Sequence, residues 1–186
     1  LTAAAAIYDP VTTTDELIPS GETSSYRSNP LRLSEFALSR KDPQYVPRAK
    51  AILAEERKRR AGEAAGALMG RDPKTTGLVS FIMALKPGDG SAREQAASCQ
   101  RVLGGCANLC AEFATKRYRS NVVNWGMLPF IAEDVKEWQI QPGDQLYLPG
   151  IRAALERGEE NIQAILVQNG TERPVTLKLP GITQEE

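Results

Sequence analysis

The chain has 186 residues, of which 41% are hydrophobic, and its 23 basic side chains balance 23 acidic ones. This length and composition are typical of one globular domain with its own core, and they exclude a disordered or fibrous protein. Zero formal net charge gives no overall field that would attract a nucleic acid or an anionic membrane, so any anion site must be local. We therefore expect residues 1–186 to form a single domain.

Several kinds of chemistry are excluded by residues that the chain lacks. It has no histidine, which removes Ser-His-Asp and Cys-His catalysis and most zinc sites. The longest apolar run, 78–85, is far too short to cross a bilayer, and no signal-like sequence opens the chain. Cys99, Cys106 and Cys110 are odd in number and contain no Cys-x-x-Cys pair. We interpret them as reduced, buried thiols of a cytoplasmic protein rather than as disulfides or metal ligands.

The first forty residues carry weak structural signals. The chain begins at Leu1 without a methionine, and we expect residues 1–6 to be a flexible or artificial start to a piece of a longer protein. Residues 7–19 are interpreted as a loop with a short strand, and residues 31–38 as a turn or two of helix.

A surface helix is predicted within the segment 43–66. From Gln44, apolar residues recur near helical spacing with charged residues between them. The basic cluster 57–60 is balanced by neighbouring glutamates and has no interleaved aromatic residues for base stacking. The cluster therefore indicates a solvated helix face and not a nucleic-acid site.

The middle of the chain predicts an α/β fold. Residues 78–85 form a continuous apolar run between turn residues, which is typical of a strand buried on both faces. A glycine loop at 87–90 and a helix from about residue 91 to 102 follow. The pattern repeats with a short apolar segment at 106–110 and a helix over 112–124. This order favours a mixed, partly parallel sheet with helices against it.

After Pro129 the sequence changes to short strands separated by turn residues. We expect these strands at residues 139–140, 145–148, 161–168 and 174–179. The dipeptide Asn169-Gly170 predicts a hairpin between the last two. The domain therefore ends in a β-rich tail.

The start of the predicted helix at Ser91 is a candidate functional site. Ser91 and Glu94 have the spacing of a capping box, which explains both residues structurally. Arg93 in the first turn opposes the helix dipole and is not explained by a cap. Gly88 and Gly90 allow backbone amides to approach a ligand, and an arginine can bind a carboxylate through two hydrogen bonds. The pattern alone leaves a simple cap and an anion site both open.

Four stretches resemble the C-terminal swivel domain of the aconitase superfamily. They are TTTDELIPSG, SSYRSNP, GDGSAREQAA with its following LGG, and RSNVVNWGMLP. They occur in the family's order and cover most of residues 9–130. The resemblance implies a swivelling β/β/α three-layer domain of a hydro-lyase, which removes water from a hydroxy acid and adds it back. It also implies that a [4Fe–4S] cluster lies on other domains of the enzyme, so that this chain binds no metal and is inactive alone.

The resemblance also implies roles for individual residues. In the family's GxSSRE loop the first serine removes the substrate proton and the arginine binds a substrate carboxylate, which implies these roles for Ser91 and Arg93. Gly90 and Ala92 belong to the same loop and are implied to contact substrate. Arg27 matches an arginine that binds a further carboxylate in aconitase-like members.

Other matching positions are implied to support the site. Asp15 matches an acid that lies behind the substrate-binding residues of the family. Asn121 and Asn124 match its N-x-x-N-x-G loop, where we expect structural hydrogen bonds.

The chain departs from the family's pattern in four places. Ala92 replaces the usual second serine, and Glu16 and Gln95 stand where aconitases commonly have histidine. The helix within 43–66 has no counterpart in the shortest small subunits and is interpreted as an insertion. These departures leave the substrate and full activity open.

Arg27 favours a hydroxy tricarboxylic acid as substrate and a fused aconitase-type hydratase as the enzyme, because isopropylmalate dehydratase small subunits have apolar residues at this place. Two alternatives remain open. One is a free-standing small subunit of an isopropylmalate dehydratase-type enzyme, which assembles with a separate large subunit. The other is an anion-binding module without catalysis. As partners we expect the cluster-carrying domains and a small carboxylate substrate, and neither nucleic acid nor membrane.

Overall fold

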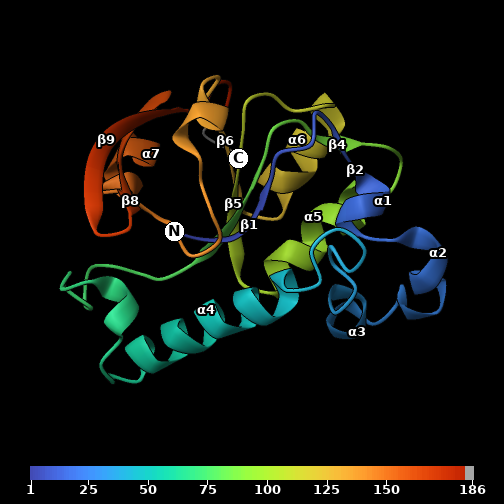
Figure 1. Ribbon diagram of the computed structural model, residues 1–186, viewed down its shortest axis with the longest axis horizontal. Coiled ribbons are helices and arrows are strands. Elements are labelled where there is room, and N and C mark those ends of the chain that lie inside the picture. Colours follow the sequence, from blue (N-terminus) through green and yellow to red (C-terminus); the bar gives the residue numbers. More distant parts are fainter. Residues whose placement is uncertain (183–186) are drawn as a thin grey trace.

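The computed structural model describes residues 1–182, and its main sheet closes into a barrel in the order β1-β3-β5-β6-β9-β8-β7 (Figure 1). The barrel strands are β1 (Thr2–Ile7), β3 (Ser80–Ala84), β5 (Gly105–Cys110), β6 (Leu128–Ile131), β7 (Gln145–Tyr147), β8 (Asn161–Gln168) and β9 (Thr171–Lys178). Neighbours among β1, β3, β5 and β6 are parallel, whereas β7, β8 and β9 pair antiparallel. The predicted α/β class with a mixed, partly parallel sheet is confirmed.

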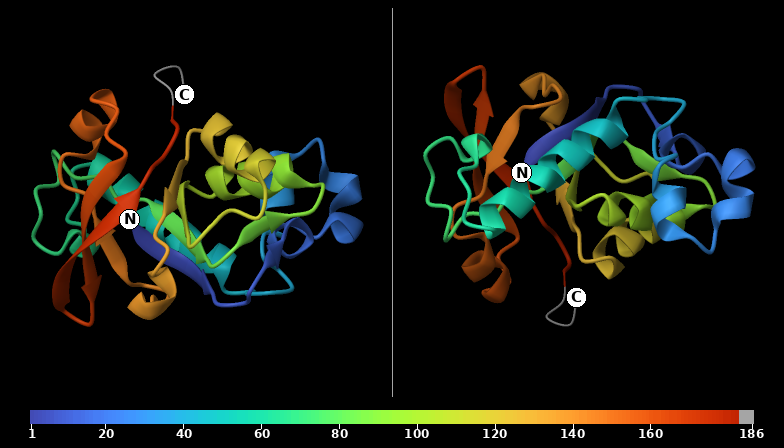
Figure 2. Two further views of the ribbon diagram at one scale, coloured as in Figure 1. Left: turned by 90° about the horizontal axis from the view of Figure 1, so that it is seen from above. Right: turned by 90° about the horizontal axis from the view of Figure 1, so that it is seen from below.

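Most of the helices lie on one face of the parallel strands, whereas the last one packs against the barrel core. The helices are α1 (Thr14–Leu17), α2 (Ser20–Thr23), α3 (Pro30–Ser34), α4 (Tyr45–Arg60), α5 (Arg93–Val102), α6 (Lys116–Asn124) and α7 (Ile151–Glu156). Three short 3-10 turns, η1 (Ser24–Tyr26), η2 (Gly66–Leu68) and η3 (Val135–Trp138), and a small sheet of β2 (Thr12–Thr13) and β4 (Pro87–Asp89) complete the described chain. Figure 2 shows α5 and α6 on one side of the parallel strands and β8 and β9 on the other. No helix within residues 1–182 is long and apolar enough to cross a membrane.

Two hydrophobic cores lie on opposite faces of the parallel strands. Along β3, Ile82 packs with the helices, whereas Phe81 and Met83 point into the barrel. All residues of β3 are buried, as the continuous apolar run predicts. The sheet thus separates a helix-side core from a barrel core, which gives the three layers of the implied fold.

The opening residues belong to the sheet, so the prediction of a flexible start at residues 1–6 was wrong. β1 pairs in parallel with β3 from Thr2 onward, and Ala3, Ala4 and Ala5 are all buried. A strand buried on both faces shows no alternation of polar and apolar residues, and alanine has low strand propensity. The segment becomes strand β1 because it pairs with β3 on one side and β7 on the other.

Most of the other elements lie where the sequence predicts them, including the hairpin, whose Asn169 and Gly170 have φ values of 49° and 75°. The strand predicted at 139–140 was wrong, because Gln139 ends η3 in the left-handed region. The helix predicted over 112–124 begins only at Lys116, where Thr115 caps it. β6 and α7 were not predicted.

Glu56 lies in the charged stretch that was expected to be solvated, but it is only 5% exposed. Its carboxylate accepts hydrogen bonds from Arg59 Nη2 at 2.6 Å, Arg60 Nε at 2.9 Å and the backbone nitrogen of Leu78 at 2.8 Å. These bonds, Arg59's above all, hold the pKa of Glu56 at about 2. Glu56 therefore ties α4 to the segment that enters β3.

Glu56→Gln is expected to lower the free energy of unfolding at pH 7 by about 2–3 kcal/mol, because the pKa of Glu56 in the folded state, about 2, lies below that of an ordinary glutamate. A lowered pKa stabilises the fold above pH ~5, and this contribution is lost as the pH falls toward 2. Denaturant unfolding between pH 2 and pH 7 should therefore show the two proteins converging at low pH. Glu55→Gln, which removes an exposed pair with Lys58, is the control and should change stability by less than about 1 kcal/mol. A pH-independent difference would contradict this account.

Candidate active site

The candidate site lies where two neighbouring parallel strands end. β1 and β3 each continue into a strand of the small sheet, and β2 and β4 pair in parallel. The Thr12 backbone nitrogen donates to the Lys86 carbonyl at 3.0 Å, which holds the two connections together. Ligand sites of α/β folds commonly lie beyond the carboxyl ends of parallel strands. This topology brings residues 13–20 beside residues 87–95.

A cavity of about 680 Å³ lies between these two segments. It is lined by Thr13, Thr14, Asp15, Ser20, Arg27, Asp89, Gly90, Ser91, Ala92, Arg93, Glu94 and Gln95. Its volume is in the usual range of small-molecule sites. The cavity brings together six of the predicted site residues from three separate stretches of sequence, while Asn121 and Asn124 do not line it.

Two glycines shape the loop that leads to Ser91. Gly88 and Gly90 have φ values of 103° and 135°, which residues with a side chain rarely adopt. A Cβ atom at Gly90 would lie only 2.2 Å from Thr14 Oγ1. The loop backbone is therefore in direct contact with the start of α1.

Ser91 does not cap α5, so the predicted capping box with Glu94 was wrong. The helix begins at Arg93 with Ala92 as its N-cap, and no side chain bonds to its first amides. A capping box does occur nearby, between Thr13 and Glu16, whose carboxylate accepts a 2.7 Å bond from the Thr13 nitrogen. Ser91 is exposed and lines the cavity. Its hydroxyl and the first amides of α5 are therefore available to a ligand.

Arg27 and Arg93 reach the cavity without an ion-pair partner in the described part of the chain, whereas Arg40 pairs with both Asp15 and Glu22 at 3.1 Å. The Nε atom of Arg93 is buried and makes no hydrogen bond within residues 1–182. A buried donor without an acceptor is unfavourable. This geometry favours an anionic ligand beside Arg93.

The cavity also contains carboxylates, so its charge alone does not select an anion. Asp89 and Glu94 line it together with Asp15. Asp15 Oδ1 accepts bonds from the backbone nitrogen and the hydroxyl of Ser20, both at 3.0 Å, and its Oδ2 pairs with Arg40. The bonds from Ser20, with Arg40 adding to them, hold the pKa of Asp15 below its usual range. Asp15 is therefore ionised and holds the turn that leads toward Arg27.

Glu16 and Gln95 stand where the resemblance noted in the sequence implies a histidine. Glu16 caps α1 and lies 3.6 Å from Lys41 Nζ, so its carboxylate is taken up by structural contacts. Gln95 lines the cavity on the first turn of α5. Neither residue replaces an imidazole at the cavity, because the Gln95 side chain is an amide, which does not titrate, and Glu16 does not line the cavity.

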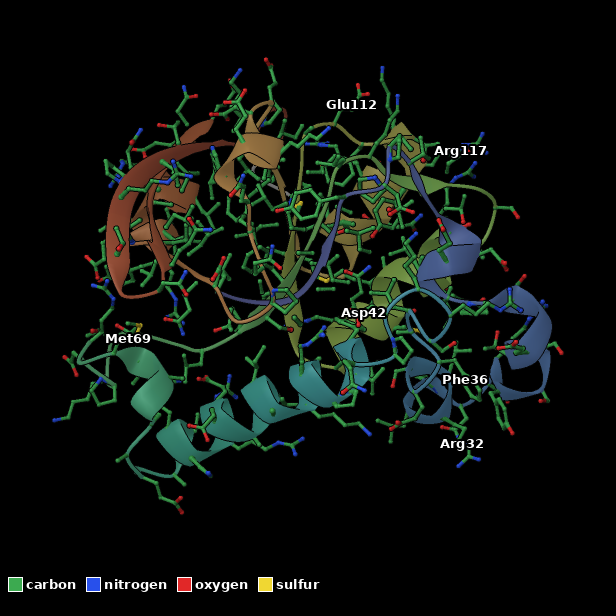
Figure 3. The ribbon with its side chains drawn as sticks, in the orientation of Figure 1. Arg32, Phe36, Asp42, Met69, Glu112 and Arg117 are labelled. Carbon is green, nitrogen blue, oxygen red and sulfur yellow. The ribbon has the colours of Figure 1, made fainter. Side chains whose placement is uncertain are left out.

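Asn121 and Asn124 lie on α6, away from the cavity. Thr115 at the start of α6 contacts the glycine loop, and Figure 3 shows Arg117, in the first turn, at the same end of the molecule as β4. Asn121 Nδ2 donates to the Arg117 carbonyl at 2.9 Å, and Asn124 is exposed at the end of the helix. Asn121 therefore bonds within its own helix, whereas Asn124 makes no side-chain hydrogen bond within residues 1–182.

The three cysteines are free thiols in separate surroundings. Burial raises the pKa of Cys99 to about 12 and raises that of Cys110 further, whereas Cys106 is partly exposed beside Arg101. Within residues 1–182 no group of three or more His, Cys, Asp or Glu residues is placed to hold a metal ion.

Comparison by sequence finds no matching family profile and no matching curated protein. Among solved structures, the chain is similar to 3-isopropylmalate dehydratase (leuD) from Methanocaldococcus jannaschii, with a TM-score of 0.60 and 21% sequence identity. The likeness covers 100% of this chain and 84% of that chain. At this identity the comparison shows the fold: an α/β domain with a mixed, partly parallel sheet.

Proposed function

We propose that this chain is the swivel component of an aconitase-type hydro-lyase that dehydrates and rehydrates a hydroxy polycarboxylic acid. The observation that carries the proposal is one cavity that contains Ser91, Arg93 and Arg27, which lie far apart in two stretches of sequence. The family motifs in these stretches and the fold shared with a 3-isopropylmalate dehydratase support the same class.

Ser91 is the proposed base for the substrate proton. A serine alkoxide is too unstable to act in water, so its charge needs fixed donors around it. The first amides of α5 have no side-chain cap, and the buried Nε of Arg93 has no hydrogen-bond acceptor within residues 1–182. Arg93 and Arg27 then each bind a substrate carboxylate, while Gly90 lets the backbone approach.

The polar lining favours a hydroxy tricarboxylic acid over a substrate with an isopropyl group. Thr14, Ser91 and Gln95 present hydroxyl and amide groups that make no side-chain hydrogen bond within residues 1–182, and among the lining residues only Ala92 has a purely apolar side chain. A branched apolar substituent would leave such groups without partners, and a polar site rejects such a ligand strongly. A further substrate carboxylate beside Arg27 would instead give these polar groups a hydrogen-bonding partner.

For the assembly we favour a separate small subunit over a fused domain. The likeness to the solved 3-isopropylmalate dehydratase chain covers all of this chain and 84% of that chain, so a fold of about this extent occurs as a chain of its own. The proposed partner is a cluster-carrying large subunit, because Cys99 and Cys110 are buried and the described residues offer no ligand set. When bound there, the [4Fe–4S] cluster would supply the Lewis acid for the substrate hydroxyl. A fused aconitase-type enzyme is the second candidate, and Arg27 is the residue that favours it.

The test is reconstitution. The chain alone should show no dehydratase activity, and addition of a cluster-carrying large subunit should give turnover of hydroxy tricarboxylates. Turnover of 3-isopropylmalate alone would contradict the proposed substrate class. Binding of tricarboxylates without turnover of any hydroxy acid would instead favour an anion-binding module.

Arg27→Lys in the assembled enzyme is expected to raise KM by about 10- to 100-fold with a smaller effect on kcat, because an ammonium group cannot reproduce the paired hydrogen bonds of a guanidinium. Steady-state kinetics measures both constants. Arg117→Lys, on the surface of α6 and outside the cavity, is the matched control. An unchanged KM would remove Arg27 from the site.

A further inference from the structure

Tyr118 on α6 is fully buried and lies directly beneath the loop that carries Ser91. A Cβ atom at Gly88 would lie 2.3 Å from Tyr118 Cγ and 2.4 Å from Cδ1, so the Gly88 backbone packs on this ring. Thr115, which caps α6, donates its hydroxyl to the Gly88 carbonyl at 3.1 Å. The first turn of α6 is therefore the surface on which the glycine loop rests.

The Tyr118 hydroxyl belongs to a closed ring of buried hydrogen bonds. It donates to Asn108 Oδ1 at 2.7 Å and accepts from Gln100 Nε2 at 2.9 Å. Asn108 Nδ2 closes the ring by donating to Gln100 Oε1 at 2.7 Å, and Gln100 Nε2 also donates to the Ala96 carbonyl at 2.8 Å. The ring joins α5, β5 and α6, and a buried network with all its members paired is rigid.

Packing alone does not require these polar groups. Gln100 and Asn108 are each no more than 3% exposed, and apolar residues of similar size would fill the space without a risk of unpaired donors. The network does fix the plane of the Tyr118 ring, on which Gly88 rests. α5, which supplies Gln100, also begins at the same loop, so both ends of the loop depend on this region.

We propose that Tyr118 is a positioning residue: its ring, anchored by Gln100 and Asn108, holds the Gly88–Ser91 loop in the conformation that places Ser91 at the cavity. The role in catalysis rests on the proposed function of Ser91. Tyr118 does not line the cavity, and its hydroxyl is occupied by the network, so it neither contacts substrate nor transfers a proton. The order of the loop can be measured in the chain alone, without any turnover.

The variants are Tyr118→Leu, which removes the ring, and Tyr118→Phe, which retains it. Tyr45→Leu is the matched control, because Tyr45 is a buried tyrosine of the same helix-side core, whereas the atoms nearest to a Cβ at Gly88 all belong to Tyr118. Should Tyr118→Leu fail to fold, Tyr118→Met fills the core with a flexible chain but gives Gly88 no flat surface.

The first readout is the NMR order parameter of the amides from Gly88 to Ser91. It should fall from a rigid value of about 0.85 to below about 0.6 in Tyr118→Leu, fall less in Tyr118→Phe, which keeps the ring but loses its anchoring hydrogen bonds, and remain high in Tyr45→Leu. The second readout is kinetic: Tyr118→Leu should lower kcat of the assembled enzyme at least about 10-fold with KM changed less, because Arg27 lies on another segment. Tyr118→Phe, which keeps the ring but loses its anchoring bonds, should give a kcat between those of the wild type and Tyr118→Leu.

The two readouts separate this inference from the proposed function. Unchanged loop order in Tyr118→Leu, or an equal loss in Tyr45→Leu, would overturn the positioning role whatever the activity. If Tyr118→Leu loses loop order and Tyr45→Leu keeps it, the positioning role is supported. If the assembled wild-type enzyme also shows no turnover, the hydro-lyase function is rejected while the positioning role stands. Loss of order with unchanged kcat would show that the loop conformation does not place a catalytic group, which overturns the proposal.

Discussion

Replacing Ser91 by alanine is expected to lower kcat of the assembled enzyme by about 100- to 10,000-fold, the usual contribution of a positioned proton acceptor. KM should change far less, because Arg27 and Arg93 remain in place. Stability should hardly change, since Ser91 is exposed and α5 has Ala92 as its N-cap. We expect a change of less than about 0.5 kcal/mol. The measurements are kcat, KM and a thermal melt on the same preparation.

Because Ser91 is not a cap, loss of activity cannot be ascribed to an unwound helix. Ser25→Ala, at an exposed serine of η1 outside the cavity, is the matched control and should leave both turnover and melting temperature unchanged. Near-normal turnover of a stable Ser91→Ala enzyme would reject Ser91 as the base. A large drop in melting temperature would indicate a structural role that the geometry does not show.

The parts of the fold that could be predicted are those with local signals. The apolar run at 78–85, the helix that begins near Gln44 and the Asn169-Gly170 turn each depend on neighbouring residues, and each is confirmed. β1 could not be predicted, because an alanine run has no strand pattern of its own and becomes a strand only between β3 and β7. Closure of the sheet into a barrel likewise depends on pairing between residues far apart, such as Thr2 with Gln145.

The candidate site could also be predicted only in part. Ser91, Arg93 and Arg27 could be named from motifs, but only the fold brings them to one cavity. The capping box failed because Ala92, with φ of −81° and ψ of 46°, delays the start of α5 by one residue beyond the spacing that a Ser91 cap requires. Glu16, which stands where the resemblance implies a histidine, completes the capping box of α1, a role that the sequence analysis missed. Tyr118 could not be predicted as a functional residue, because the sequence does not distinguish it from any other tyrosine that a helix buries in the core.

Gly88→Ala is expected to lower the free energy of unfolding by about 3–5 kcal/mol, through two separate effects. A φ of 103° strains any residue with a side chain, and the added methyl group would lie within 2.5 Å of three Tyr118 atoms that are buried and cannot move aside. The overlap involves the Cβ, Cγ and Cδ1 atoms of Tyr118, which lie near its backbone, so rotation of the side chain gives little relief. Denaturant unfolding measures the change, and the melting temperature should fall by roughly 6–20 °C.

Gly126→Ala separates the two effects of the Gly88 substitution. Gly126 also has a positive φ, 71°, but an added Cβ there would meet nothing within 4 Å, so only backbone strain remains, at about 1 kcal/mol. The difference between the two variants therefore measures the contact between Gly88 and the Tyr118 ring. In a Tyr118→Ala background that difference should shrink, because Cγ and Cδ1, two of the three overlapping atoms, are gone, whereas leucine would keep atoms at all three positions. Equal destabilisation by the two alanines would mean that the loop does not rest on Tyr118. The hydrogen bond from the Thr115 hydroxyl to the Gly88 carbonyl would then be the remaining contact through which α6 could position the loop.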